Sequence, residues 1–238
     1  MKQNSLVNCL LAGVLLFACV LGCKKGGVKS ANEGNANKSA PETPLADIAG
    51  QYSVTGTNTN GTQYSGELEV IAHGSVYEFR WSAGKEYGGV GVQNGNVVAV
   101  AFASGSSGKG CGAVSYQMEA DGTLNGKWGY WGVDESGTET AERTSGTGLS
   151  GNYNVTGTNP HGTNYKGTLE VSPEGGGYAF NWSNGSKGFG LKQGETVSVG
   201  IGGSRCGFMF YQIKSKGLEG VWGVYGSEKT GTERAMKK

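Results

Sequence analysis

The stretch from Gly50 to Val70 reads GQYSVTGTNTNGTQYSGELEV, and the stretch from Gly151 to Val171, 101 positions later, reads GNYNVTGTNPHGTNYKGTLEV. Fourteen of the 21 paired positions are identical, which chance does not produce. A long repeat at a fixed distance marks a duplicated structural unit. The main part of the chain is therefore predicted to be one β-rich unit written twice.

Apolar and polar residues alternate with a period of two in both copies, which is typical of half-buried strands. Turn signals such as Asn60-Gly61, Asn94-Gly95 and Asp121-Gly122 separate these segments, because both central residues of a tight hairpin turn take positive φ. Each copy then contains about eight strands. In the first copy they are predicted to start near Tyr52, Thr62, Val76, Tyr87, Val97, Cys111, Thr123 and Thr138.

The predicted fold is all-β, with two tandem small antiparallel up-and-down barrels of about eight strands each, since closure removes the exposed edges of a sheet. The first barrel is assigned to residues 48–144 and the second to residues 150–236. The offset between the copies shortens from 101 to 94 along the chain, and every change falls in a predicted loop. An open meander or a sandwich shared by both copies remains the alternative.

The sequence pattern resembles that of avidin- and lipocalin-type barrels. The resemblance rests on the opening Gly50-Gln-Tyr52 and on the late Leu124-Asn-Gly-Lys-Trp128 and Leu218-Glu-Gly-Val-Trp222. It implies small closed barrels and transfers no ligand residue. Barrels of this strand number are either filled by side chains or hold one small ligand. The many inward aromatic residues favour filling, whereas inward glycines at positions 56, 66 and 126 leave room.

The first 22 residues are predicted to be a lipoprotein signal peptide. A positive start is followed by an apolar run from Cys9 that is shorter than a membrane span of ~20 residues. The run ends in Val20-Leu-Gly-Cys23, which resembles the lipobox of bacterial lipoproteins. The resemblance implies cleavage before Cys23 and acylation of that residue, palmitate included, with anchoring in the membrane lipid. An ordinary secretory signal, an uncleaved anchor and a rival site at Cys19 are the alternatives.

The expected location is the cell envelope, and the outer membrane or cell surface if the organism has one, because no Asp follows Cys23. Residues 23–47 carry almost no large apolar side chain, so they are predicted to form a flexible tether. Removal of the predicted signal peptide also removes Lys2, which leaves 19 basic and 19 acidic side chains. This balance argues against nucleic acid as a partner.

Catalytic and metal-binding signatures are weak. The two histidines, His73 and His161, fall in turns and do not match between copies, so no metal and no cofactor is expected. The Gly-rich stretch 104–110 lacks the spacing of a phosphate loop and is interpreted as a flexible hairpin. Recurrent carboxylates at positions 69 and 170 and at positions 139 and 233 are of the type that supports glycoside hydrolysis, but duplication alone explains their recurrence.

Cys111 and Cys206 occupy equivalent positions in the two copies. In an exported protein, two thiols tend to oxidise, which would join the copies by a disulfide. One small buried thiol in each barrel is the competing interpretation, and it ranks slightly ahead of the disulfide.

Four aromatic residues are candidates for contact with a ligand or partner. Trp131 and its counterpart Tyr225 fall on the outward phase, and Phe208 and Phe210 make one strand of the second copy apolar on both faces. The two phenylalanines are interpreted as an interface between the copies in preference to a partner patch.

The hypothesis that fits these features best is a non-enzymatic, membrane-anchored surface lipoprotein that acts as a binding module. Its expected partner is a protein, a glycan or a small ligand, and adhesion and enzyme inhibition both fit this class. Duplication adds avidity to such a module. A structural or envelope-maintenance lipoprotein without a specific ligand is the alternative, and an enzyme ranks third.

Overall fold

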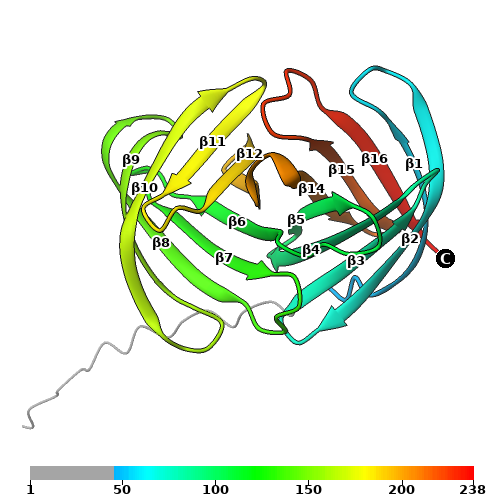
Figure 1. Ribbon diagram of the computed structural model, residues 1–238, viewed down its shortest axis with the longest axis horizontal. Helices are drawn as coiled ribbons and strands as arrows, with labels where there is room; N and C mark the ends of the chain where they lie inside the picture. The colour runs from blue at the N-terminus through cyan, green and yellow to red at the C-terminus, as the bar shows by residue number, and fades with distance from the viewer. Residues whose placement is uncertain (1–45) are drawn as a thin grey trace, which may run out of the picture. The chain divides into compact units, whose positions relative to one another are not determined.

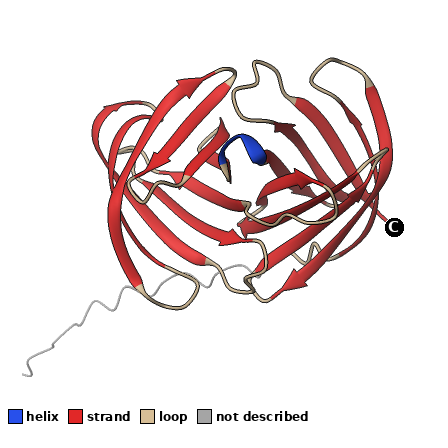
Figure 2. Ribbon diagram, in the orientation of Figure 1, coloured by secondary structure: helices blue, strands red, loops and turns tan. Residues whose placement is uncertain are grey.

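The computed structural model describes residues 46–238, so the predicted signal peptide, Cys23 and most of the tether lie outside the described residues. The described part contains sixteen strands and one short 3-10 helix, η1, which Figure 2 shows in blue. No helix in this part is long and apolar enough to cross a membrane. The first eight strands are β1 Gly50–Thr57, β2 Gln63–His73, β3 Val76–Ser82, β4 Glu86–Asn94, β5 Val97–Ser104, β6 Gly112–Met118, β7 Leu124–Tyr130 and β8 Gly137–Thr147.

The other elements are β9 Ser150–Thr158, β10 Asn164–Glu174, β11 Gly177–Trp182, β12 Lys187–Gln193, β13 Thr196–Ile201, η1 Gly203–Arg205, β14 Gly207–Lys214, β15 Gly217–Gly223 and β16 Gly231–Lys237. Each predicted strand start in the first copy lies within two residues of the observed one. The two-residue alternation therefore located the strands correctly.

The strands form two closed eight-stranded antiparallel barrels, as predicted. The first barrel runs β1-β16-β15-β14-β5-β4-β3-β2, and the second runs β10-β11-β12-β13-β6-β7-β8-β9. Each barrel thus takes five strands from one copy of the repeat and three from the other. Figure 1 shows the consequence, since β1 near the start of the chain lies beside β16 at its end.

The assignment of residues 48–144 to one barrel and 150–236 to the other is therefore wrong. Two crossover segments, residues 105–111 and 202–206, carry the chain from one barrel to the other. Because the two copies have the same inward-facing pattern, the last three strands of either copy can close either barrel. The sequence pattern predicts the strands but does not distinguish these two closures.

Two seams join the copies within each barrel. In the first barrel β5 pairs with β14 and β1 pairs with β16, and in the second barrel β13 pairs with β6 and β8 pairs with β9. Each strand finds both of its neighbours within residues 46–238. This part of the chain is accordingly a complete folding unit.

One end of each barrel is closed by a buried aliphatic residue just before the first strand of each copy. Ile48 closes the first barrel, and the Tyr52 hydroxyl donates a hydrogen bond of 2.6 Å to its carbonyl oxygen. Leu149 closes the second barrel, and Tyr153 donates in the same way over 2.7 Å. Burial and the charge of Asp47 raise the pKa of Tyr52 to about 12, so this hydroxyl remains a donor at neutral pH.

The barrels pack against each other through strands that are buried on both faces. β5 is one such strand, and its outward residues Ala99 and Ala101 join a small apolar cluster with Cys111 and Cys206. Side chains from the two barrels also contact each other directly, with the ring centroids of Phe189 and Phe208 5.6 Å apart and their planes tilted by 58°. This contact explains why these strands lack the polar outer face of the others.

Candidate ligand-binding pockets

A buried glutamate lies inside each barrel. Glu233 in β16 is 5% exposed and Glu139 in β8 is 6% exposed. Each glutamate shares the inward face of its strand with a buried alanine two positions further along, Ala235 in β16 and Ala141 in β8. The two glutamates occupy equivalent positions in the two copies of the repeat, but they lie in different barrels.

In the first barrel three donors converge on Glu233. Its Oε1 atom accepts hydrogen bonds from Trp81 Nε1 at 2.9 Å and from the Tyr211 hydroxyl. Its Oε2 atom accepts one from the Tyr64 hydroxyl at 2.7 Å. Tyr64 and Trp81 come from the first copy, whereas Tyr211 and Glu233 come from the second. The exchange of strands therefore assembles this cluster from both copies.

The second barrel repeats the arrangement around Glu139. Its donors are Trp182 Nε1 at 3.0 Å, the Tyr165 hydroxyl at 2.8 Å and the Tyr116 hydroxyl. Here Trp128 Nε1 also donates to the Tyr165 hydroxyl over 2.9 Å.

Burial controls the protonation of the first-barrel cluster. Desolvation raises the pKa of Glu233, and the hydrogen bonds from its two tyrosines and its tryptophan oppose that rise. Burial, followed by the charge of Glu233, raises the pKa values of Tyr64 and Tyr211 well above the ordinary value. The phenols consequently remain protonated and donate to the carboxylate.

A pocket of about 440 Å³ lies at the end of the first barrel opposite Ile48. Turns between strands form its rim, and Glu233 is part of its lining. The wall takes one large side chain from each of six neighbouring strands: Trp222 (β15), Met209 (β14), Phe102 (β5), Tyr87 (β4), Trp81 (β3) and Tyr64 (β2). We call this set with Glu233 the first-barrel pocket.

The second barrel has an equivalent but smaller pocket of about 280 Å³, which includes Glu139 in its lining. Trp128, Tyr165 and Trp182 correspond to the aromatic residues of the first barrel. By strand register, however, Ser186 and Ile201 replace Tyr87 and Phe102. The second-barrel pocket therefore has a thinner aromatic wall.

The interiors are thus filled at one end and hollow at the other. The space beside Gly56 is taken by the Tyr64 ring, and the space beside Gly126 by the Tyr116 ring. These inward glycines make room for aromatic side chains that reach the glutamates, and they do not form the cavity themselves.

The four aromatic residues predicted as contact candidates do not form an exposed patch. Phe208 and Phe210 are each 1% exposed, which leaves no surface for a partner. Tyr225 is half-buried with its ring 5.5 Å from that of Phe189, and Trp131 is half-buried against the apolar cluster of the two cysteines. The interface interpretation of the two phenylalanines agrees with their position.

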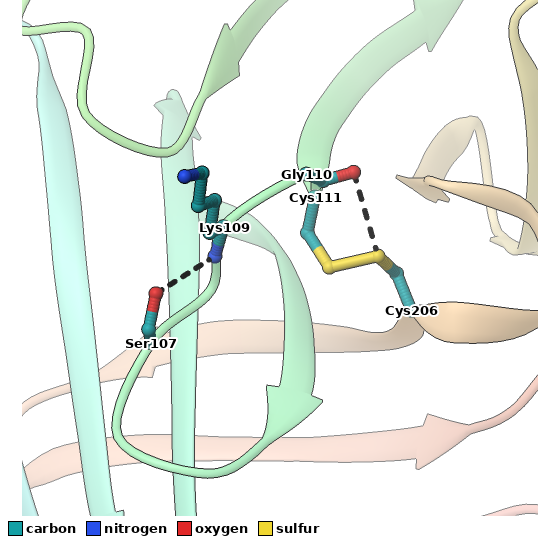
Figure 3. The surroundings of a disulfide bond; sticks show 5 residues. All are labelled: Ser107, Lys109, Gly110, Cys111 and Cys206. Carbon is teal, nitrogen blue, oxygen red and sulfur yellow. Dashed lines mark hydrogen bonds between the residues drawn. A yellow bond between two sulfur atoms is a disulfide. The ribbon is translucent and has the colours of Figure 1, made fainter.

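Cys111 and Cys206 are joined by a disulfide whose Cα atoms are 5.8 Å apart. The bond links the two crossover segments to each other beside the apolar cluster between the barrels, and Figure 3 shows its surroundings. The Cys206 sulfur lies 3.8 Å from the Gly110 carbonyl oxygen. This contact is not a hydrogen bond, because a disulfide sulfur carries no proton. The exposed Ser107 and Lys109 flank the bond in the first crossover.

Other candidates from the sequence lie away from the pockets. Glu69 is on the outer face, where it accepts a 2.8 Å hydrogen bond from Gln51, and Glu170 is exposed. His73 lies 3.1 Å from Glu78 near a turn, and His161 is exposed in another turn. Among residues 46–238, no group of three or more His, Cys, Asp or Glu side chains is placed to hold a metal ion.

Sequence reasoning missed the structural role of Glu139 and Glu233. The available signal was their phase, since each glutamate lies between two outward polar residues, Thr138 and Thr140 or Thr232 and Arg234. The next inward residues on either side are Gly and Ala: Gly137 and Ala141, Gly231 and Ala235. Comparisons of the chain with protein-family models, with curated proteins and with solved structures find no match.

Proposed function

We propose that the protein is a non-enzymatic, lipid-anchored binding protein of the cell envelope that takes small ligands at the open ends of its barrels. The observation that carries the proposal is the first-barrel pocket, closed at the far end by Ile48 and walled by large apolar side chains around one buried carboxylate. Its volume of about 440 Å³ lies within the ~300–1,000 Å³ of typical small-molecule sites, which are mainly apolar with a few placed polar groups.

The position of the glutamates supports binding over glycoside hydrolysis. That reaction uses two carboxyl groups on either side of one bond. Glu233 is the one carboxylate among the described residues that line the first-barrel pocket, and Glu139 lies in the other barrel. The anchor in this proposal is Cys23, and its support is the lipobox in the sequence. A tether of about two dozen residues then holds the barrels away from the membrane surface.

Native mass spectrometry tests the binding proposal. Residues 46–238 are exported without the anchor and saturated with N-phenyl-1-naphthylamine, a neutral apolar fluorescent probe. We expect one or two bound probes per chain and saturable fluorescence.

Matched variants assign the probe to a barrel. W222L should remove binding in the first barrel, and W128L should remove it in the second, because each removes the equivalent wall residue. A bare protein mass with the probe in excess, and no saturable fluorescence in the unmodified protein, would overturn the proposal.

A further inference from the structure

The aromatic side chains of the first-barrel pocket are arranged around it as a cage. The ring centroids of Tyr87 and Phe102 are 6.0 Å apart, with 84° between the ring planes. The ring centroids of Phe102 and Trp222 are 6.1 Å apart, with 78° between the planes. The ring planes of Trp81 and Phe102 make an angle of 61°, and those of Tyr64 and Trp222 make an angle of 69°. Neighbouring rings at steep angles enclose a space from several directions.

Glu233 is the one carboxyl group among the described residues that line this cage. Glu233 has three neutral donors, and no Lys or Arg of the described residues bonds to it. Its Oε1 atom accepts two hydrogen bonds and its Oε2 atom only one, so Oε2 keeps an acceptor position free. Lys85 is the one cationic side chain in the lining, and it is exposed at the rim.

A cation surrounded by aromatic rings is attracted by their quadrupoles, and quaternary ammonium groups are recognised in this way. A buried carboxylate without a cationic partner is unfavourable, and a cation bound beside it offsets that penalty. Building on the proposed function, we propose that the first-barrel pocket binds an organic cation, an ammonium group carrying methyl or other small alkyl substituents, with Glu233 as its counter-charge.

The second barrel provides a comparison within the same molecule. It has the same buried glutamate, but Ser186 and Ile201 stand where the first barrel has Tyr87 and Phe102. Two of the five rings are thus absent from the equivalent positions, although Tyr130 adds one ring at the rim. The two barrels are accordingly expected to differ in ligand, with the cation in the first.

The test uses three probes on residues 46–238 by calorimetry and tryptophan fluorescence. They are tetramethylammonium, choline and 3,3-dimethylbutan-1-ol, in which a carbon atom replaces the charged nitrogen of choline. We expect both cations to bind at least about tenfold more tightly than the neutral alcohol, because only they gain from the rings and the carboxylate.

Three variants assign this preference to residues. E233Q should lower the ratio of cation affinity to alcohol affinity about tenfold, since glutamine loses the charge. E139Q is the matched control in the second barrel and should leave this ratio as it is in the unmodified protein. The double variant Y87S/F102I, which gives the first barrel the second barrel's residues, should also lose the cation preference.

Equal binding of choline and its neutral analogue by the unmodified protein would overturn the inference, whatever the variants do. Binding of neither cation would overturn it too. In both cases the proposed function stands if N-phenyl-1-naphthylamine still binds and is lost in W222L, so the two failures are distinguishable.

Discussion

Glu233 shows how one side chain couples the interior of a barrel to pH. Burial raises its pKa in the folded protein above that in the unfolded chain. The folded state then holds the proton more tightly, so this group contributes stability fully below the unfolded pKa of ~4.3. That contribution is lost as pH rises through the folded pKa.

The pH dependence is measured by chemical unfolding of the unmodified protein and of E233Q. Glutamine does not titrate, so we expect the difference in unfolding free energy to shift in favour of the variant as pH rises from about 4 to 8. A difference that stays constant over this range would contradict the raised pKa.

Gly56 is a second residue whose identity follows from a close contact. A Cβ atom there would collide with the Tyr64 ring and with the Thr232 carbonyl oxygen. We expect G56A to lower the unfolding free energy by about 1–3 kcal/mol, as overpacking of a filled interior does. It should also displace Tyr64 from Glu233.

The matched control for G56A is T55A, on the same strand but with an exposed side chain. Thermal and denaturant unfolding of both variants provide the measurement. Equal stability of the two variants would show that Tyr64 does not fill the space beside Gly56.

At the scale of elements, the crossovers are the parts of the chain that the disulfide constrains. Cys111 and Cys206 are 95 residues apart in sequence, so their bond closes a long loop in the unfolded chain. We expect C111S/C206S to lower the unfolding free energy by about 2–5 kcal/mol, with the barrels retained. Denaturant unfolding measures the loss, and circular dichroism measures the strand content. An unchanged unfolding free energy would contradict this role of the bond.

The strands were predictable because their signal is local. Alternation and turn residues are written in each segment, and the inward phase of Trp81 and Trp222 follows from them. The role of Glu233 was harder to predict, because a carboxylate in a barrel interior contradicts the usual pattern. Only its three donors, from distant parts of the chain, explain how it is accommodated.

For the whole molecule, the exchange of strands between the copies decides where the pockets form. It was not predictable, because the two copies present equivalent partners and no local signal selects between them. Its consequence is that each pocket depends on both copies: Tyr64 and Trp81 meet Trp222 and Glu233 only when the last three strands of the second copy close the first barrel.

Engineered cysteine pairs test this exchange most directly. Thr55 and Arg234 are neighbours on β1 and β16 and are both exposed. If each copy formed its own barrel, Thr55 would instead face Thr140, which in this structure pairs with Thr156. Mild oxidation of dilute T55C/R234C and T55C/T140C, followed by peptide mapping under non-reducing conditions, separates the two arrangements. We expect an intramolecular cross-link between positions 55 and 234 and none between 55 and 140. The opposite result would contradict the strand exchange and, with it, the shared pockets.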